Sequence, residues 1–410
     1  MTPSGRGLVV FASGVAMWIA ARLLGSPALE VVGFGLTCLP FLAAAYVRMG
    51  KQQVVLRRRL SDGRVQPGTR VTVTIDVENR SAGPTSFLLV EDRLPPALGR
   101  PARLVVTGVQ RHAVEHVSYT VLPQTRGRFR LGPLSVDVSD PFALTRQRIE
   151  FDMRDELLVI PEVEDLLGAS DPTSGPSFGA MRARHLFRTG EEYYTMRAYQ
   201  EGDDLRRIHW PSVARTGDIM IRQDESSRRS SGLVFLDTRA SALGQAHTPA
   251  FERAISVGAT LGVLLAQRGF SLRLATADAA PAPVSEERFL DALAGISHAS
   301  TRSIGPALVH LRAGSSADTT LIYVAPPPAP TELPSLIRAG AGYGPKLAVL
   351  VYPMDPAALP PERLAQMEGR ATQGRLALTR SGWDCIVLSP SMRLKERWHA
   401  PKEHRLARSV

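Results

Sequence analysis

Two apolar runs close to the N-terminus constrain this chain more than any other feature. Residues 8–24 carry one charge, Arg22, while residues 29–47 carry one charge, Glu30, and one proline, Pro40. Each run is about as long as the ~20 apolar residues that a helix needs to cross a bilayer, and a proline is tolerated where neighbouring helices pack. Because only a short break separates the runs, the sequence predicts two transmembrane helices joined as a hairpin.

Basic residues after the second run predict how the hairpin is oriented. The cluster consists of Arg48, Lys51, Arg57, Arg58 and Arg59. Basic residues beside a span mark the cytoplasmic side and are attracted to anionic headgroups. A cleaved signal peptide is the alternative, because one arginine before an apolar stretch also begins secretory signals. The second span argues against it, so we expect a multi-pass plasma-membrane protein with cytoplasmic soluble domains.

Composition excludes several classes of protein. The length of 410 residues predicts two or three domains. The net charge of +10 is concentrated in the cluster at residues 48–59 and in the tail at residues 393–410, and no aromatic residues interleave the first cluster, which argues against a nucleic-acid partner. Cys38 and Cys385 lie far apart and indicate neither a disulfide framework nor a cysteine metal site. We expect no cofactor.

Residues 51–160 have the pattern of a β-rich domain. Apolar and polar residues alternate at period two over residues 70–77, and further alternating stretches follow turn-forming clusters. Such spacing predicts a small, immunoglobulin-like β-sandwich. His112 and His116 have no carboxylates arranged around them and are interpreted as surface or strand-filling residues.

Residues 190–225 form the most distinctive segment of the chain. Its motif consists of Arg197, Tyr199, Gly202, Asp203, Arg206, Ile208, Trp210, Ala214 and Arg215. The motif resembles the signature of the bacterial family called domain of unknown function 58, and residues 124–134 and 140–144 are similar to the end of that family's β-domain. His209 departs from the family pattern.

The resemblance implies a membrane-anchored protein with a von Willebrand A-like C-terminal domain, often encoded beside MoxR-type AAA+ ATPases. Physically, the charged motif residues could form an ion-pair network. Two interpretations stay open: a structural latch or a partner-binding surface. They concern Arg197, Tyr199, Gly202, Asp203, Arg206, Trp210 and Arg215. Tyr199 and Trp210 are expected to be packing residues.

The segment from residue 232 to 392 alternates buried strands with helices, which predicts a doubly wound parallel α/β sheet. Asp237, Arg239 and Ser241 follow its first strand and resemble the von Willebrand A metal motif D-x-S-x-S, with Arg239 in place of the first serine. Mg²⁺ requires oxygen ligands, and arginine offers none. We therefore predict a degenerate site without metal, in which Arg239 pairs with Asp237.

The expected function is that of a membrane-tethered scaffold or adaptor that presents protein-binding domains, with a MoxR-type ATPase as the partner that the resemblance implies. The alternatives are a metal-dependent receptor and an envelope-polymer hydrolase. We expect no enzyme, because none of Ser212, Ser241 and Cys385 has a histidine at a useful spacing. The predicted domains are the hairpin (1–50), the β-sandwich (51–160), the connector with the motif (161–231), the α/β domain (232–392) and the basic tail (393–410).

Overall fold

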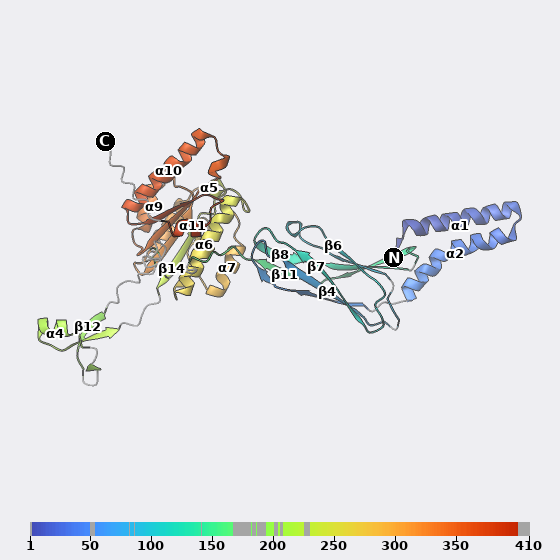
Figure 1. The fold of residues 1–410 in the computed structure, drawn as a ribbon, viewed down its shortest axis with the longest axis horizontal. Coiled ribbons are helices and arrows are strands. Elements are labelled where there is room, and N and C mark those ends of the chain that lie inside the picture. Colours follow the sequence, from blue (N-terminus) through green and yellow to red (C-terminus); the bar gives the residue numbers. More distant parts are fainter. Residues whose placement is uncertain are drawn as a thin grey trace. The chain divides into compact units, whose positions relative to one another are not determined.

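The computed structural model describes residues 2–49, 54–81, 83–85, 87–140, 142–166, 182, 186, 194–200, 204–205, 208–224 and 230–400 (Figure 1). The chain divides into two compact units, Met1–Ile160 and Pro161–Val410. Each unit has its own hydrophobic clusters and is described by itself.

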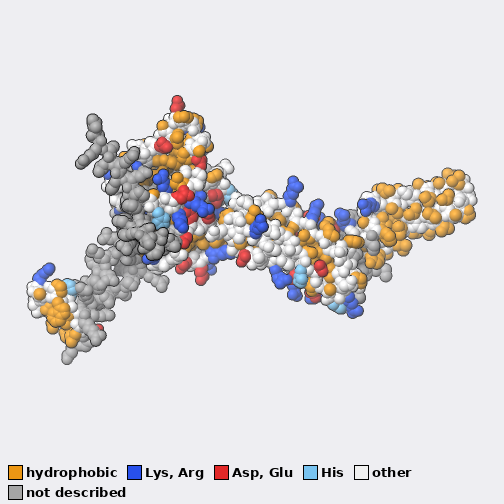
Figure 2. Space-filling model, in the orientation of Figure 1, with side chains coloured by type: hydrophobic (Ala, Val, Ile, Leu, Met, Phe, Trp, Pro, Cys, Tyr) orange, Lys and Arg blue, Asp and Glu red, His pale blue; other side chains and the backbone are white. Residues whose placement is uncertain are grey.

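The two predicted N-terminal helices are present as α1 (Gly5–Leu24) and α2 (Pro27–Met49), which lie side by side (Figure 1). Glycines allow their close approach: a Cβ on Gly33 would lie 2.6 Å from the backbone nitrogen of Trp18. The charges of the two runs pair at the turn, where Arg22 Nε lies 2.8 Å from Glu30 Oε1. Figure 2 shows hydrophobic side chains over the visible surface of the hairpin, as expected of a lipid-facing surface.

Length and composition make three of the described helices candidates for a membrane span: α1, α2 and α6 (Pro249–Gln267). The most apolar window of α6 is 78% buried inside its own unit, whereas those of α1 and α2 are 17% and 11% buried. The apolar character of α6 is therefore explained by protein packing, and only α1 and α2 leave their apolar surfaces uncovered.

The rest of the first unit is built from strands. They are β1 (Thr2–Pro3), β2 (Val54–Leu60), β3 (Arg64–Val65), β4 (Val71–Asn79), β5 (Leu88–Asp92), β6 (Ala102–Val106), β7 (Val114–Val121), β8 (Gly127–Leu131), β9 (Leu134–Ser139), β10 (Thr145–Phe151) and β11 (Asp155–Val159). They form sheets in the orders β1-β10-β9-β5-β6, β2-β4-β7 and β3-β11-β8. The predicted alternation is present in β4, whose every second residue is buried.

Two of these sheets share one hydrophobic core. Leu56 and Ile75 from β2 and β4 belong to the same cluster as Leu88 and Val136 from β5 and β9. The side chains of His112 and His116 are exposed, as predicted. His116 Nδ1 lies 2.7 Å from Asp76 Oδ1 across the β4–β7 pair.

The predicted juxtamembrane cluster is wrong at one position, Arg58. Its side chain lies on the inward face of β2 and is fully buried, with Nη2 2.6 Å from Asp92 Oδ1 and Nη1 2.7 Å from Asp155 Oδ2. Successive side chains of a strand point to opposite faces, so the neighbouring Arg57 and Arg59 face outward and are exposed. Arg58 therefore belongs to the core of the β unit and is not available to lipid headgroups.

The second unit contains a six-stranded sheet covered by helices (Figure 1). Its strands are β14 (Ser231–Leu236), β15 (Ser271–Thr276), β16 (Ala282–Val284), β17 (Thr319–Ala325), β18 (Lys346–Val351) and β19 (Asp384–Leu388). Its helices are α5 (Ala240–Leu243), α6, α7 (Glu286–Ala294), α8 (Gly305–Ala313), α9 (Leu333–Gly340), α10 (Pro361–Arg380) and α11 (Leu394–Trp398). The order is β16-β15-β14-β17-β18-β19, parallel except for the antiparallel edge strand β16, which the sequence did not predict.

Alternate residues of the central strand β14 enter two separate cores. Val234 and Leu236 join one cluster with α6 and α7, and Leu233 and Phe235 join another with α8, α9 and α10. Helices thus cover both faces of the sheet, which explains why these strands are almost continuously apolar.

Glu164 ties the segment after β11 to the second unit. Its carboxylate accepts hydrogen bonds from the backbone nitrogens of Leu394 and Lys395 at the start of α11, and lies 3.0 Å from Arg253 Nη1 of α6. The Glu164 backbone nitrogen donates to Thr260 Oγ1. The chain is therefore anchored to the α/β unit a few residues after the β unit ends.

Candidate functional site at the carboxyl edge of the parallel sheet

The strand order of the α/β sheet changes direction between β14 and β17. From β14 the chain continues to β15 on one side, and from β17 it continues to β18 on the other. Asp237 directly follows β14, and its backbone nitrogen donates to the Val324 carbonyl oxygen of β17 at 2.9 Å. In parallel sheets such a switch point at the carboxyl ends of the strands is the usual place for a ligand.

Arg239 and Asp237 form the predicted pair at this switch point. Arg239 Nε donates to Asp237 Oδ1 at 2.9 Å, and Nη2 donates to Oδ2 at 2.7 Å. The Asp237 side chain is fully buried, and that of Arg239 is 8% exposed. This two-pronged geometry is the strong form of an arginine–carboxylate contact, and it occupies the oxygens with which Asp237 would bind a cation.

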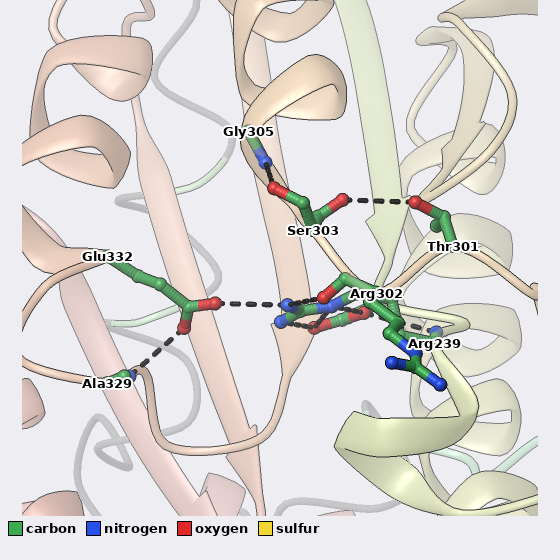
Figure 3. A network of polar contacts seen from close by, with 8 residues as sticks. Arg239, Thr301, Arg302, Ser303, Gly305, Ala329 and Glu332 are labelled. Carbon is green, nitrogen blue, oxygen red and sulfur yellow. Dashed lines mark hydrogen bonds and ion pairs between the residues drawn. The ribbon is translucent and has the colours of Figure 1, made fainter.

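A second carboxylate, which sequence reasoning missed, contacts the same guanidinium. Arg239 Nη1 lies 3.0 Å from Glu332 Oε1 and 3.3 Å from the Arg302 carbonyl oxygen, and Glu332 Oε2 accepts a hydrogen bond from the Ala329 nitrogen (Figure 3). Glu332 directly precedes α9, in the connection that leaves β17. Nothing in the local sequence signals this contact, because it spans 93 residues.

Electrostatics around the guanidinium hold it in its charged form. Burial by itself lowers the pKa of Arg239, but hydrogen bonds and charges from Asp237 and then Glu332 outweigh burial, and the net pKa is raised. Tyr323 of β17 lies nearby with its ring stacked on that of Phe235. Burial and then the negative charge of Asp237 raise the pKa of Tyr323. The site therefore contains a permanent cation between two carboxylates.

The segment 299–305 lies beside this cation and is held by hydrogen bonds. The Ala299 nitrogen donates to the Thr238 carbonyl oxygen at 2.7 Å, which fixes the segment next to the turn that carries Arg239. Ser303 Oγ accepts from the Gly305 nitrogen at the start of α8, and Thr301 Oγ1 donates to the Ser303 carbonyl oxygen (Figure 3).

A cavity of about 420 Å³ opens beside the cluster. Its lining includes Arg239, Ser241, Glu332, Met354, Arg363 and Arg370. Arg363 and Arg370 are exposed on α10, and within the described part of the chain no ion pair involves either of them. Asp237, Arg239 and Glu332 together carry one net negative charge, so Arg363 and Arg370 bring the net charge of the cluster and cavity to one positive charge.

The signature motif lies in a separate small element of the described chain. Strands β12 (Tyr194–Ala198) and β13 (Met220–Asp224) pair antiparallel, with Arg197 opposite Ile221, and α4 (Trp210–Thr216) lies between them in sequence. The Tyr199 nitrogen donates to the Ile219 carbonyl oxygen at 2.9 Å. Gly202, Asp203 and Arg206 fall outside the described residues, so the ion-pair network expected there stays a prediction.

Two expectations about α4 need correction. Trp210 was expected to be a packing residue, but its side chain is 68% exposed, and Arg215 is exposed as well. Ser212 was expected to lack a histidine, but its Oγ lies 2.7 Å from His209 Nδ1. His209 is the N-cap of α4 and Ser212 is the third residue of the helix, so this contact joins two side chains across the first helical turn, and the His209 side chain does not cap a backbone N–H group.

Comparison with known proteins places the motif in a family. Residues 195–310 match the family described as Protein of unknown function DUF58. The "Uncharacterized protein YeaD" of Bacillus subtilis (strain 168) is 24% identical over 214 residues, which cover 50% of this chain and 51% of the relative. The match thus spans about half the length of that relative.

Similarity to solved structures is weak. The CARDB domain of a Pyrococcus furiosus protein is 10% identical, with a TM-score of 0.20 over 26% of this chain and 93% of that one. A β-glucosidase from Listeria innocua is 16% identical, with a TM-score of 0.16 over 24% of this chain and 16% of the enzyme. Such scores carry no argument about fold or function. The family match over residues 195–310, joined to the motif and to the relative, identifies this segment of the chain as a region of the DUF58 family of proteins of unknown function.

Proposed function

We propose that this chain is a membrane-tethered scaffold or adaptor whose soluble units bind protein partners. The uncovered apolar surfaces of α1 and α2 support a tether made of two transmembrane spans. The shared core of the β2-β4-β7 and five-stranded sheets supports an immunoglobulin-like sandwich. The strand order β16-β15-β14-β17-β18-β19 supports a von Willebrand A-like α/β domain.

One observation carries the proposal: Arg239 lies between Asp237 and Glu332 at the switch point of the sheet. A protein side chain there supplies the positive charge that a divalent cation would otherwise supply. The cavity beside it is lined by Arg363 and Arg370, which offer ten N–H donors in all to an incoming acceptor. We place the docking site here and assign to it an acidic segment of a partner protein, because guanidinium groups bind carboxylates in two-pronged geometry.

The proposed orientation puts both soluble units in the cytoplasm. Arg6 at the start of α1 and Arg57 after α2 are exposed basic residues close to the same end of the hairpin. With Arg58 buried, the basic cluster is smaller than the sequence suggested, yet its remaining members still favour the cytoplasmic side. Protease protection in spheroplasts tests this orientation: digestion of the soluble units from outside would contradict it.

The partner we propose is a MoxR-type AAA+ ATPase, and this choice rests on the family resemblance alone. The test is co-purification of the ATPase with the detergent-solubilised full chain in the presence of ATP. The chain with Arg363→Glu and Arg370→Glu should lose the partner, because charge reversal repels an acidic segment.

A matched control variant tests whether the partner is lost because the cavity is altered or because the net charge of the chain is altered. Arg288 on α7 and Arg312 on α8 are exposed arginines that do not line the cavity. Arg288→Glu with Arg312→Glu changes the net charge by the same amount and should retain the partner. Equal loss in both double variants would reject the cavity as the docking site, and no co-purification with the unaltered chain would reject the ATPase.

A metal-dependent receptor is the second candidate, favoured by the position of Asp237 and Ser241 at the switch point. It requires Asp237 to exchange a guanidinium partner for a cation, at the cost of leaving Arg239 buried without that carboxylate. Within the described residues no group of three or more His, Cys, Asp and Glu side chains is placed to hold a metal ion.

A further inference from the structure

A turn that joins β9 to β10 is fixed by a buried carboxylate. Asp140 is 1% exposed, and its Oδ1 accepts a hydrogen bond from the Phe142 nitrogen at 2.9 Å. Its Oδ2 accepts from the Thr145 nitrogen at 2.6 Å and from Thr145 Oγ1 at 3.0 Å. A charged group with three donors around it holds Phe142 and Thr145 closely in place relative to Asp140.

The same turn holds the first residues of α1. The Ser4 nitrogen donates to the Leu144 carbonyl oxygen at 2.9 Å, and Ser4 Oγ donates to the Ala143 carbonyl oxygen at 2.6 Å. Ser4 Oγ also accepts from the Gly7 nitrogen and so caps the helix. A Cβ on Gly7 would collide with the Leu144 carbonyl oxygen, so the helix and the turn are in direct backbone contact.

The turn presents an aromatic side chain that the β unit does not cover. Phe142 is 65% exposed, and so is a neighbouring aromatic residue, Phe87, at 54%. The backbone places Phe87 at the same end of the unit, because its carbonyl oxygen accepts from the Ser139 nitrogen at the end of β9. Two phenylalanines are therefore exposed at the end of the β unit whose β9–β10 turn binds the start of the apolar hairpin.

We infer that this end of the β unit rests on the bilayer, with Phe142 and Phe87 in the headgroup region. The inference rests on the proposed membrane tether. The apolar run of α1 begins about one helical turn, or ~5 Å, after Ser4, so the turn that binds Ser4 lies at the depth of the headgroups. Arg6, exposed in the first turn of α1, supplies a cation at the same level for anionic lipid.

Continuity with the hairpin selects lipid over a protein as the occupant. The two phenylalanines lie where the chain must meet the membrane surface if α1 and α2 span it. Exposed phenylalanine side chains of interfacial segments bury at the boundary between headgroups and acyl chains. The turn would thereby fix the angle at which the β unit leaves the membrane, since Asp140 holds Phe142 and Thr145 in place.

Spin-label accessibility in lipid vesicles tests the inference on the full chain. Labels are attached to single cysteines in a background with Cys38→Ser and Cys385→Ser. Collision rates with oxygen and with a water-soluble nickel complex then report depth. For a label at Phe142→Cys, the ratio of the oxygen collision rate to the nickel collision rate should lie between the ratio for a label in hydrocarbon and the ratio for a label in water. Phe87→Cys gives an independent reading of the same surface should the first variant fail to fold.

Two reference labels make every outcome decisive. Phe34, 62% exposed on α2, reports hydrocarbon. Leu122, 44% exposed directly after β7, lies at the end of the β unit away from the hairpin and reports water. Labels at Phe142 and Phe87 that match the Leu122 label would overturn the inference while leaving the tether intact. A Phe34 label in water would instead reject the tether itself. A Leu122 label at headgroup depth would also overturn it, because the surface would then not be specific to this end.

Discussion

Arg58 and Asp92 form a fully buried ion pair in the β unit, with Arg58 Nη2 2.6 Å from Asp92 Oδ1 and Nε 2.9 Å from Oδ2. Tyr119 also donates to Asp92 Oδ2 at 2.6 Å, and Asp155 supplies a second carboxylate to Arg58. Every polar contact here links different strands. The group therefore ties the three sheets of the β unit to one another, a role for which buried ion pairs are suited when fully hydrogen-bonded.

Replacing Arg58 should destabilise the β unit strongly. Arg58→Ala leaves the buried Asp92 carboxylate without its cation, at a cost of about 3–5 kcal/mol. Arg59→Ala removes an exposed partner of Asp76 and should cost no more than about 1 kcal/mol. Urea unfolding of both variants measures the difference, and equal losses would show that burial does not govern the energetics of this pair.

Close contact between α1 and α2 depends on Gly33. A Cβ there would meet the Trp18 backbone at 2.6 Å, whereas a Cβ on Gly35 meets nothing within 4 Å. Gly33→Leu should therefore separate the helices and lower the midpoint of thermal unfolding in detergent, and Gly35→Leu should leave it nearly unchanged. Similar midpoints for both variants would contradict the described helix contact.

Cys385 should be an unreactive thiol in the folded protein. Burial, and then the charge of Asp384, raises its pKa from 9.0 to about 12. Such a thiol is ionised about a thousandfold less at pH 8, because each pKa unit is tenfold. Iodoacetamide should alkylate it slowly in a Cys38→Ser chain and rapidly after unfolding in guanidinium. Fast labelling of the folded chain would contradict the raised pKa of this half-buried thiol.

The same shift gives a pH dependence of stability. Below pH 9 both folded and unfolded states carry the neutral thiol, so its contribution to stability is fully present. Between pH 9 and about 12 only the unfolded state loses the proton, and the free energy of unfolding falls as pH rises. Cys385→Ala should remove this part of the alkaline destabilisation, measured by urea unfolding across that range.

The contact between Ser212 and His209 should not create a reactive serine. Within the described residues no hydrogen bond joins a carboxylate to His209, which a charge-relay arrangement would need. A fluorophosphonate probe should therefore leave the full chain unlabelled. Labelling that Ser212→Ala abolishes would revive the hydrolase alternative.

Periodicity in the sequence predicted most of the fold. The two apolar runs, the alternation in β4 and the buried strands β14, β15, β17, β18 and β19 all have a local signature that survives in the structure. The edge strand β16 and the short helix α5 were missed because three or four residues are too few to show a period. Helix α8 was missed although it has nine residues.

The site was predictable only where it is local in sequence. Asp237 and Arg239 are two residues apart, and their chemistry alone predicted the pair. Glu332 and the cavity-lining Arg363 come to the same place through the crossover connections of the sheet. No pattern in the amino-acid sequence predicts that these two residues lie close together. The burial of Arg58 was misread because basic residues next to a span fit the positive-inside pattern whichever way the side chain points.

The central claim is that Arg239 takes the place of a metal ion at the switch point of the sheet. Calorimetric titration with Mg²⁺ and Mn²⁺ tests it on the full chain and on Arg239→Ser, which restores the serine of the D-x-S-x-S pattern. The account predicts no binding by the unaltered chain, binding by Arg239→Ser, and no binding once Asp237→Ala is added to that variant. Micromolar binding by the unaltered chain that Asp237→Ala abolishes would contradict it.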